Sequence, residues 1–234
     1  MPSTMERRHV ANEMEVRAAG DGKRTLTGYA AVFGRYSSDL GGFVERIAAG
    51  AFAKTIQESD IRVLVNHDAS LILGRSLAGV GTARLAEDSQ GLHYEVDLPG
   101  TQAARDLSES IERGDVTGSS FAFSAVGPDG DEWSKTEQDY PLRTVNQARL
   151  YDVGPVTYPA YEATGEEASQ VAVRSLASRL GLPDLSADAD AIREALNKRD
   201  AGESQREPEQ PSTPAWLAEA RDRMKLAELV HGAA

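Results

Sequence analysis

Short segments in which apolar and polar residues alternate constrain the fold of this chain more than any other feature. Between residues 92 and 98 every second side chain is apolar, and those between them are His93, Glu95 and Asp97. Residues 120–126 alternate in the same way, with Phe121 and Phe123 on one face. Because successive side chains of a strand point to opposite faces, this pattern predicts half-buried β-strands.

Other segments extend this prediction. Residues 26–33, 62–66 and 149–157 also predict strands, the last of them broken by Pro155. Residues 48–58 predict a short helix, and Thr101 is suited to cap a second helix that ends at Gly114. We therefore expect an α+β domain that is mainly β, with its strands forming a barrel.

The pattern changes after Thr164. We expect a folded domain over residues 1–165, short helical segments over 166–200, a disordered linker over 201–214 and a C-terminal helix over 215–234. Residues 201–214 are rich in Gly, Glu, Ser, Gln and Pro, a composition typical of disorder, whereas 215–231 has helical spacing of apolar residues.

Composition and missing motifs exclude several classes of function. The net charge is −12, from 25 basic and 37 acidic side chains, which disfavours nucleic-acid binding. No apolar run is long enough to span a membrane, and the N-terminal residues lack the apolar region of a secretion signal. There is no cysteine, no Walker loop, no paired histidines and no Gly-x-Ser-x-Gly elbow. We expect no metal and no cofactor.

Nucleophilic serine catalysis remains. It needs a hydroxyl, an imidazole that takes its proton, and a third group that orients the imidazole. His67 is the best presented of the four histidines, because it follows an apolar strand, whereas His93 lies on a polar face and His9 and His231 lie near the ends. The residues alone leave open whether Ser119 or Ser120 is the nucleophile.

Five blocks in order resemble the prohead maturation proteases of tailed phages. They are Leu-Thr-Gly-Tyr-Ala-Ala-Val-Phe at 26–33, Glu-Arg-Ile at 45–47 with Gly-Ala-Phe at 50–52, Val-Asn-His-Asp at 65–68 with Gly-Arg at 74–75, Gly-Asp-Val-Thr-Gly-Ser-Ser-Phe-Ala-Phe at 114–123, and Leu-Tyr-Asp-Val-Gly-Pro-Val-Thr-Tyr-Pro-Ala-Tyr at 150–161. Each block is weak alone, but their common order and spacing make the resemblance specific.

The resemblance implies a serine endopeptidase distantly similar to the herpesvirus assembly proteases, with a β-barrel surrounded by helices. Its substrates would be the scaffold, the scaffolding segment of the major capsid protein, and the protease itself, which is also a candidate homo-oligomer. It would act in the host bacterial cytoplasm, inside the prohead, without nucleic acid or membrane as partners.

The resemblance also assigns roles to residues. Ser120, which precedes Phe121-Ala122-Phe123, is the nucleophile, and His67 is the general base. Asp152 is our choice for the third member, with Asp68, Asp115 or a second histidine as alternatives. The loop around 143–149 is a candidate for the oxyanion donors.

Two rival interpretations remain. A non-enzymatic capsid assembly or scaffold protein that retains the fold would account for the acidic helical tail. A β-rich binding module unrelated to capsids would account for the alternation but not for the ordered blocks.

Overall fold

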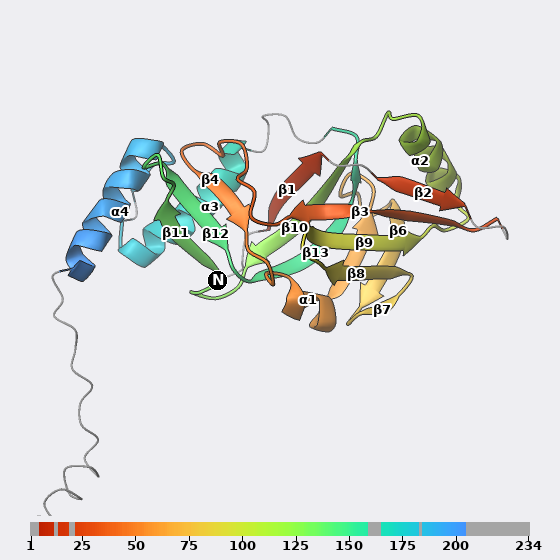
Figure 1. The fold of residues 1–234 in the computed structure, drawn as a ribbon, viewed down its shortest axis with the longest axis horizontal. Helices are drawn as coiled ribbons and strands as arrows, with labels where there is room; N and C mark the ends of the chain where they lie inside the picture. Colours follow the sequence, from red (N-terminus) through yellow and green to blue (C-terminus); the bar gives the residue numbers. More distant parts are fainter. Residues whose placement is uncertain (1–4, 12–13, 19–21, 159–164, 183, 205–234) are drawn as a thin grey trace, which may run out of the picture. The chain divides into compact units, whose positions relative to one another are not determined.

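The computed structural model describes residues 5–11, 14–18, 22–158, 165–182 and 184–204, which form three sheets and four helices (Figure 1). The strands, the first three helices and the beginning of the fourth belong to a compact unit that ends at Leu196. The expectation of an α+β fold that is mainly β is confirmed. The division of the chain into a domain and tail segments stays a prediction.

The first sheet carries Ser120 and Asp152 on its strands and His67 in the turn between two of them. Its spatial order is β1 (Glu6–Ala11), β10 (Gly118–Ala125), β13 (Ala148–Val156), β5 (Asp60–Leu64), β6 (Ile72–Leu77) and β7 (Val80–Gly81). All neighbours are antiparallel except β13 and β5, which run parallel.

Two smaller sheets complete the unit. The second sheet has the order β2 (Glu15–Ala18), β3 (Arg24–Val32), β9 (Gly91–Asp97) and β8 (Ala83–Glu87). The third has the order β11 (Asp131–Lys135), β12 (Pro141–Val145) and β4 (Val44–Ile47). The strands predicted at 26–33, 92–98 and 120–126 are therefore present as β3, β9 and β10.

The sheets do not close into the barrel that we expected. A barrel needs backbone hydrogen bonds between its first and last strands. Here each of the three sheets ends in two edge strands, and the first and second sheets meet through side chains instead. Alternation of apolar and polar residues along a strand shows which face of the strand is buried. Strands of an open sandwich and strands of a barrel both have this pattern, so the pattern does not distinguish the two folds. A likeness to the herpesvirus proteases stays a prediction.

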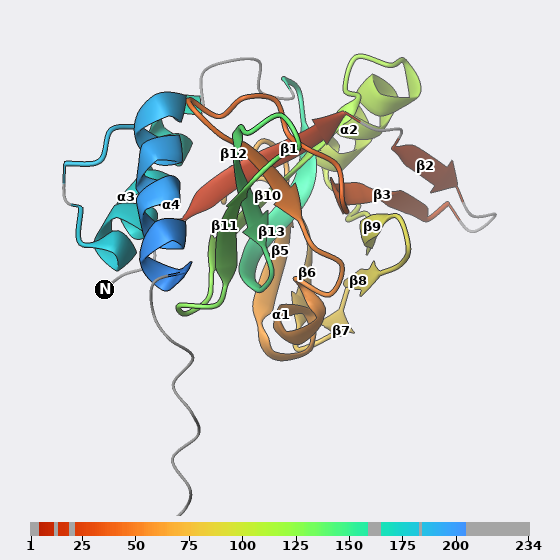
Figure 2. The ribbon, with the colours of Figure 1, turned by 60° about the vertical axis from the view of Figure 1, so that its left-hand side comes forward.

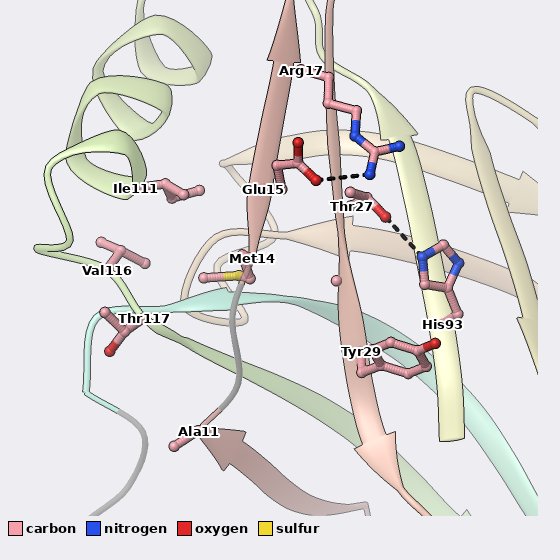
Figure 3. A pocket seen from close by; sticks show the side chains of 11 residues that line it. Ala11, Met14, Glu15, Arg17, Thr27, Tyr29, His93, Ile111, Val116 and Thr117 are labelled. Carbon is pink, nitrogen blue, oxygen red and sulfur yellow. Dashed lines mark hydrogen bonds and ion pairs between the residues drawn. The ribbon is translucent and has the colours of Figure 1, made fainter. Parts of the chain in front are cut away.

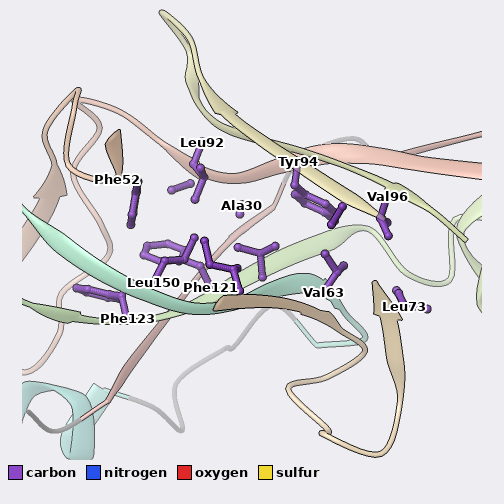
Figure 4. Packing of buried hydrophobic residues seen from close by; sticks show 14 of the residues in the cluster. Ala30, Phe52, Val63, Leu73, Leu92, Tyr94, Val96, Phe121, Phe123 and Leu150 are labelled. Atoms are coloured by element: carbon purple, nitrogen blue, oxygen red, sulfur yellow. The ribbon is translucent and has the colours of Figure 1, made fainter. Parts of the chain in front are cut away.

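The main core lies between the first and second sheets (Figure 4). Phe121 and Val63 of the first sheet are buried together with Leu92, Tyr94 and Val96 of the second, all at most 2% exposed. The alternation that predicted β9 thus places its apolar face in this core. Burying each such side chain contributes about 1.5–3 kcal/mol to folding.

The two predicted helices near the core form with altered limits. Thr101 caps α2 (Gln102–Glu112) as expected, because its hydroxyl accepts a hydrogen bond from the N–H of Ala104 at 3.3 Å. The helix predicted at 48–58 is shorter and begins only at Ala53, as α1 (Ala53–Glu58). Gly50 has a φ of +88°, a left-handed conformation that keeps the preceding turn out of the helix.

A second, smaller core joins the third sheet to the last two helices (Figure 1, Figure 2). Phe43 and Trp133 pack with ring centroids 4.8 Å apart, against α3 (Gly165–Leu180) and the first part of α4 (Ala189–Ser204). Helical segments were expected here. The linker predicted at 201–214 begins inside α4, which continues to Ser204, so its first four residues are helical. The rest of the linker and the helix predicted at 215–234 lie outside the described residues.

Pro155 does not break its strand, contrary to our expectation. β13 continues to Val156, with Pro155 opposite Ser119 of β10. The carbonyl of Pro155 accepts from the N–H of Asn66 at 3.0 Å, so its nitrogen faces the same side. On that side β5 has already ended at Leu64, so no ladder hydrogen bond is lost to the missing N–H.

A buried network of charges ties β1 to the third sheet. Arg143 of β12 is 1% exposed and contacts three carboxylates, Glu6 at 2.6 Å, Glu45 at 2.8 Å and Asp131 at 2.5 Å. Arg8 of β1 also binds Glu45, at 2.8 Å. Burial alone lowers the pKa of the Arg143 guanidinium, but Glu6 and Glu45 outweigh this effect and raise it. β1 is therefore held in place although it is an edge strand.

Candidate active site

Ser120 lies on β10, a strand buried on both faces. Its neighbours across the sheet are His9 on β1 and Gly154 on β13, and it is 3% exposed. Because β10 is a central strand, ladder hydrogen bonds to both neighbouring strands fix the backbone of Ser120. The position of Ser120 is therefore set by the sheet rather than by a loop.

His67 lies in the turn between β5 and β6. Asn66 and His67 both have left-handed backbone conformations, with φ of +53° and +58°, which non-glycine residues adopt at a cost. The side chain of Asn66 fastens this turn to the chain after β13, since its amide donates to the Thr157 hydroxyl at 3.1 Å and its oxygen accepts from the Thr157 N–H at 2.9 Å. The strand predicted at 62–66 is thus present two residues earlier, as β5, and a constrained turn follows it.

The three residues proposed from the sequence meet in a chain of two hydrogen bonds. Nε2 of His67 lies 2.6 Å from Oγ of Ser120, and Nδ1 of His67 lies 2.5 Å from Oδ1 of Asp152. The side chains of His67 and Asp152 are 10% and 11% exposed. With Nδ1 donating to Asp152, Nε2 is free to accept the hydroxyl proton of Ser120, which is the arrangement of a serine nucleophile with its base.

The Ser120 hydroxyl has a second acceptor within reach. Its Oγ lies 2.8 Å from the backbone carbonyl oxygen of Arg8 on β1. A hydroxyl donates only one hydrogen bond at a time. The Arg8 carbonyl therefore competes with His67 for the Ser120 proton in the resting molecule.

The alternatives to these residues are occupied elsewhere. Ser119 is fully buried on the core face, where its hydroxyl lies 3.0 Å from that of Tyr94, whose pKa is raised by burial. Asp68 accepts from the N–H and hydroxyl of Ser70, and exposed Asp115 pairs with Arg113 at 3.1 Å. None of these contacts involves His67, so the geometry favours Ser120 and Asp152.

The other three histidines lie in different parts of the chain. His93 lies 2.7 Å from the Thr27 hydroxyl on the second sheet, and His231 lies outside the described residues. His9 is directly opposite Ser120, although its position near the N-terminus gave no indication of this. The pairing of β1 with β10 brings His9 beside Ser120, and no periodicity in the sequence predicts that pairing.

Ser120 and His67 open into a cavity of about 350 Å³. Its lining comes from β1, β10, the His67 turn and the end of β13: Arg7, His9, Asn66, His67, Ser120, Val156, Thr157 and Tyr158.

A larger cavity of about 760 Å³ lies between β2, β3, β9 and α2 (Figure 3). There Glu15 pairs with Arg17 at 2.7 Å, and His93 lies 2.7 Å from the Thr27 hydroxyl, but no carboxylate among the described residues is hydrogen-bonded to His93 as Asp152 is to His67.

Several donors of the loop around 143–149 serve the fold, and an oxyanion role for the rest of the loop stays a prediction. The N–H groups of Asn146 and Gln147 both donate to the carbonyl of Gly130, and that of Ala148 donates to Ala51. The side chain of Arg143 is surrounded by carboxylates. These donors serve the fold because the loop closes against neighbouring turns, which the sequence pattern did not show.

In the described part of the chain, no group of three or more His, Asp or Glu side chains is arranged to hold a metal ion. Among the same residues, no helix has the length and apolarity needed to cross a bilayer.

Two known proteins align with about two thirds of this chain. The prohead protease of Enterobacteria phage HK97 is 30% identical over 159 residues, which cover 66% of this chain and 64% of that protein. The chain thus spans somewhat less than two thirds of that relative. The solved structure of the bacteriophage T4 capsid assembly protease gp21 aligns with 65% of this chain and 97% of its own, at a TM-score of 0.42 and 11% identity.

The family model described as caudovirus prohead serine protease matches residues 12–178, a range that contains the whole hydrogen-bonded chain of Ser120, His67 and Asp152. This protein belongs to the caudovirus prohead serine protease family.

Proposed function

We propose that this protein is a serine endopeptidase in which Ser120 is the nucleophile, His67 the general base and Asp152 the residue that orients His67. The observation that carries the proposal is the continuous pair of short contacts, 2.6 Å from Ser120 to His67 and 2.5 Å from His67 to Asp152. Side chains from three separate strands or turns converge here, and a purely structural role would not require this order of groups.

The chemistry follows from the atoms in contact. Oγ of Ser120 attacks the carbonyl carbon of a substrate peptide while Nε2 of His67 takes the hydroxyl proton. The imidazolium then gives this proton to the leaving amine, and an ester to Ser120 remains. Water, deprotonated by His67, hydrolyses the ester and restores the hydroxyl. Asp152 stabilises the imidazolium in both halves of the cycle.

Family membership supports the choice of substrates. We propose that the protein cleaves the scaffold or the scaffolding segment of a major capsid protein during prohead maturation, and that it also cleaves itself. The site of action would be the assembling prohead in the host bacterial cytoplasm.

Coexpression with a capsid precursor tests the proposal. Intact mass measurement of the precursor and of the protease itself detects cleavage. The measurement is made for the wild type, Ser120→Ala and Ser119→Ala. We expect Ser120→Ala to abolish all cleavage. Ser119→Ala should retain cleavage and lose about 1 kcal/mol of stability, because it removes only the hydrogen bond to Tyr94.

The same measurement separates the rival functions. A capsid assembly protein without activity would leave the precursor intact in all three variants while still entering proheads. A binding module unrelated to capsids would do neither. Cleavage that persists in Ser120→Ala would overturn the assignment of the nucleophile.

A further inference from the structure

Two basic side chains lie on the same face of the sheet as Ser120. In the pairing of β1 with β10, Arg7 is opposite Ala122 and His9 is opposite Ser120. Directly opposed residues of an antiparallel pair point to the same face, with their Cβ atoms about 4.5–5.5 Å apart. Arg7 and His9 therefore flank the nucleophile, and both line its cavity.

Arg7 is exposed, and its guanidinium has no ion pair or hydrogen bond with any residue in the described ranges. Arg8, the next residue, shows the opposite arrangement, because it is buried and bound to both Glu6 and Glu45. The alternation of β1 thus separates one arginine that stabilises the fold from one that faces the catalytic cavity.

Among the residues that the structure describes, none of those lining this cavity carries a carboxylate. Its basic members are Arg7, His9 and His67, although acidic residues outnumber basic ones by 37 to 25 in the whole chain. Such a chain repels acidic peptides over most of its surface, so a local basic site at the nucleophile selects where an acidic segment is bound. A guanidinium binds a carboxylate with two parallel hydrogen bonds, which fixes its position as well as its charge.

We infer that Arg7, assisted by His9, recognises an acidic side chain of the substrate close to the scissile bond. The inference rests on the proposed function and adds the substrate class. Arg7 is two residues from the position opposite Ser120, roughly 7 Å along the strand at about 3.4 Å per residue. The acidic residue therefore lies within about two positions of the bond that Ser120 attacks.

The chain itself contains segments of this class. Residues 205–214, which follow α4, carry Glu207 and Glu209 in a composition typical of disorder, which an extended cleavage site needs. If the protein cleaves itself, the inference places the cuts beside these glutamates.

A mixture of synthetic decapeptides of random sequence tests the inference, with cleavage sites identified by mass spectrometry. For the wild type we expect Asp and Glu to be enriched within two positions of the cut. Two peptides that differ only by Glu or Gln at the enriched position should differ about tenfold in kcat/KM, and the difference should shrink as salt is raised.

Variants at Arg7 give the specific readout. Arg7→Gln should reduce the preference for Glu over Gln to about one, and Arg7→Glu should favour a Lys peptide over the Glu peptide. Arg24→Gln is the matched control, because it removes the same charge on β3 at a residue that does not line the catalytic cavity. It should leave the preference unchanged.

The outcomes separate the inference from the proposed function. Cleavage by the wild type without any preference for acidic residues overturns the inference alone. An equal loss of rate for both peptides in Arg7→Gln also overturns it, since Arg7 would then act on the reacting carbonyl and not on a side chain. Failure of the wild type to cleave either the peptides or a coexpressed precursor overturns the proposed function, and the inference with it.

Discussion

Gly154 and Leu64 approach each other so closely that a side chain at Gly154 would collide with the backbone. A Cβ at Gly154 would lie 2.0 Å from the carbonyl oxygen of Leu64. Gly154 is opposite Ser120 on β13, and Leu64 is the last residue of β5 before the His67 turn. The missing side chain therefore lets the His67 turn lie against the strand that carries Asp152.

Gly154→Ala should separate β5 from β13 and misplace His67. We expect a loss of stability of about 1–3 kcal/mol from overpacking, and a loss of most cleavage activity. Urea denaturation and precursor cleavage measure the two effects. Gly100→Ala is the control, because nothing lies within 4 Å of a Cβ there and it should be nearly neutral. A Gly154→Ala variant with normal stability would show that the two strands move apart without cost.

Asn66 should be a positioning residue for His67. Asn66→Ala removes both side-chain hydrogen bonds to Thr157 and places alanine at a φ of +53°, so we expect kcat to fall by about 10- to 100-fold. Asn66→Asp keeps an oxygen that accepts from the Thr157 N–H and should retain most of the activity. Equal kcat values for the Ala and Asp variants would contradict this role. Thermal denaturation should show a loss of about 1–2 kcal/mol for Asn66→Ala, because alanine is strained at this φ, and little change for Asn66→Asp.

Asp152→Asn should preserve the fold but lose the tautomer of His67 that accepts the Ser120 proton. We expect the rate of cleavage to fall by about 10⁴-fold, as in other serine triads. Asp115→Asn, which changes an exposed residue that pairs with Arg113, should keep the wild-type rate. Retention of activity within tenfold in Asp152→Asn would exclude Asp152 as the third member.

Replacing an arginine of the buried charge network should destabilise the protein more than replacing an exposed arginine. Arg143→Met leaves Glu6, Glu45 and Asp131 buried without their common partner and should cost about 3–5 kcal/mol. Arg84→Met breaks two exposed ion pairs, with Glu95 and Asp97, and should cost about 1 kcal/mol or less. Urea denaturation of both variants makes the comparison. Similar costs would mean that the Arg143 cluster is reached by water in the folded state.

The sequence by itself determined the features that depend on neighbouring residues. Alternation at 92–98 predicted β9 because a strand exposes and buries every second side chain whatever it pairs with, and Thr101 predicted the start of α2 because a cap acts within one turn. The ordered blocks indicated the family and singled out His67, Ser120 and Asp152 as candidates, whose catalytic roles stay a prediction.

Only the tertiary structure decided which residues share a site. The pairing of β1 with β10 brings Arg7 and His9 beside Ser120 from more than 100 positions away, and no local pattern encodes that register. The open sheets, the uninterrupted strand at Pro155 and the occupied amides of 146–148 likewise differ from the sequence-based expectations. Each depends on where another strand ends or where another carbonyl points, which is set by packing between distant parts of the chain.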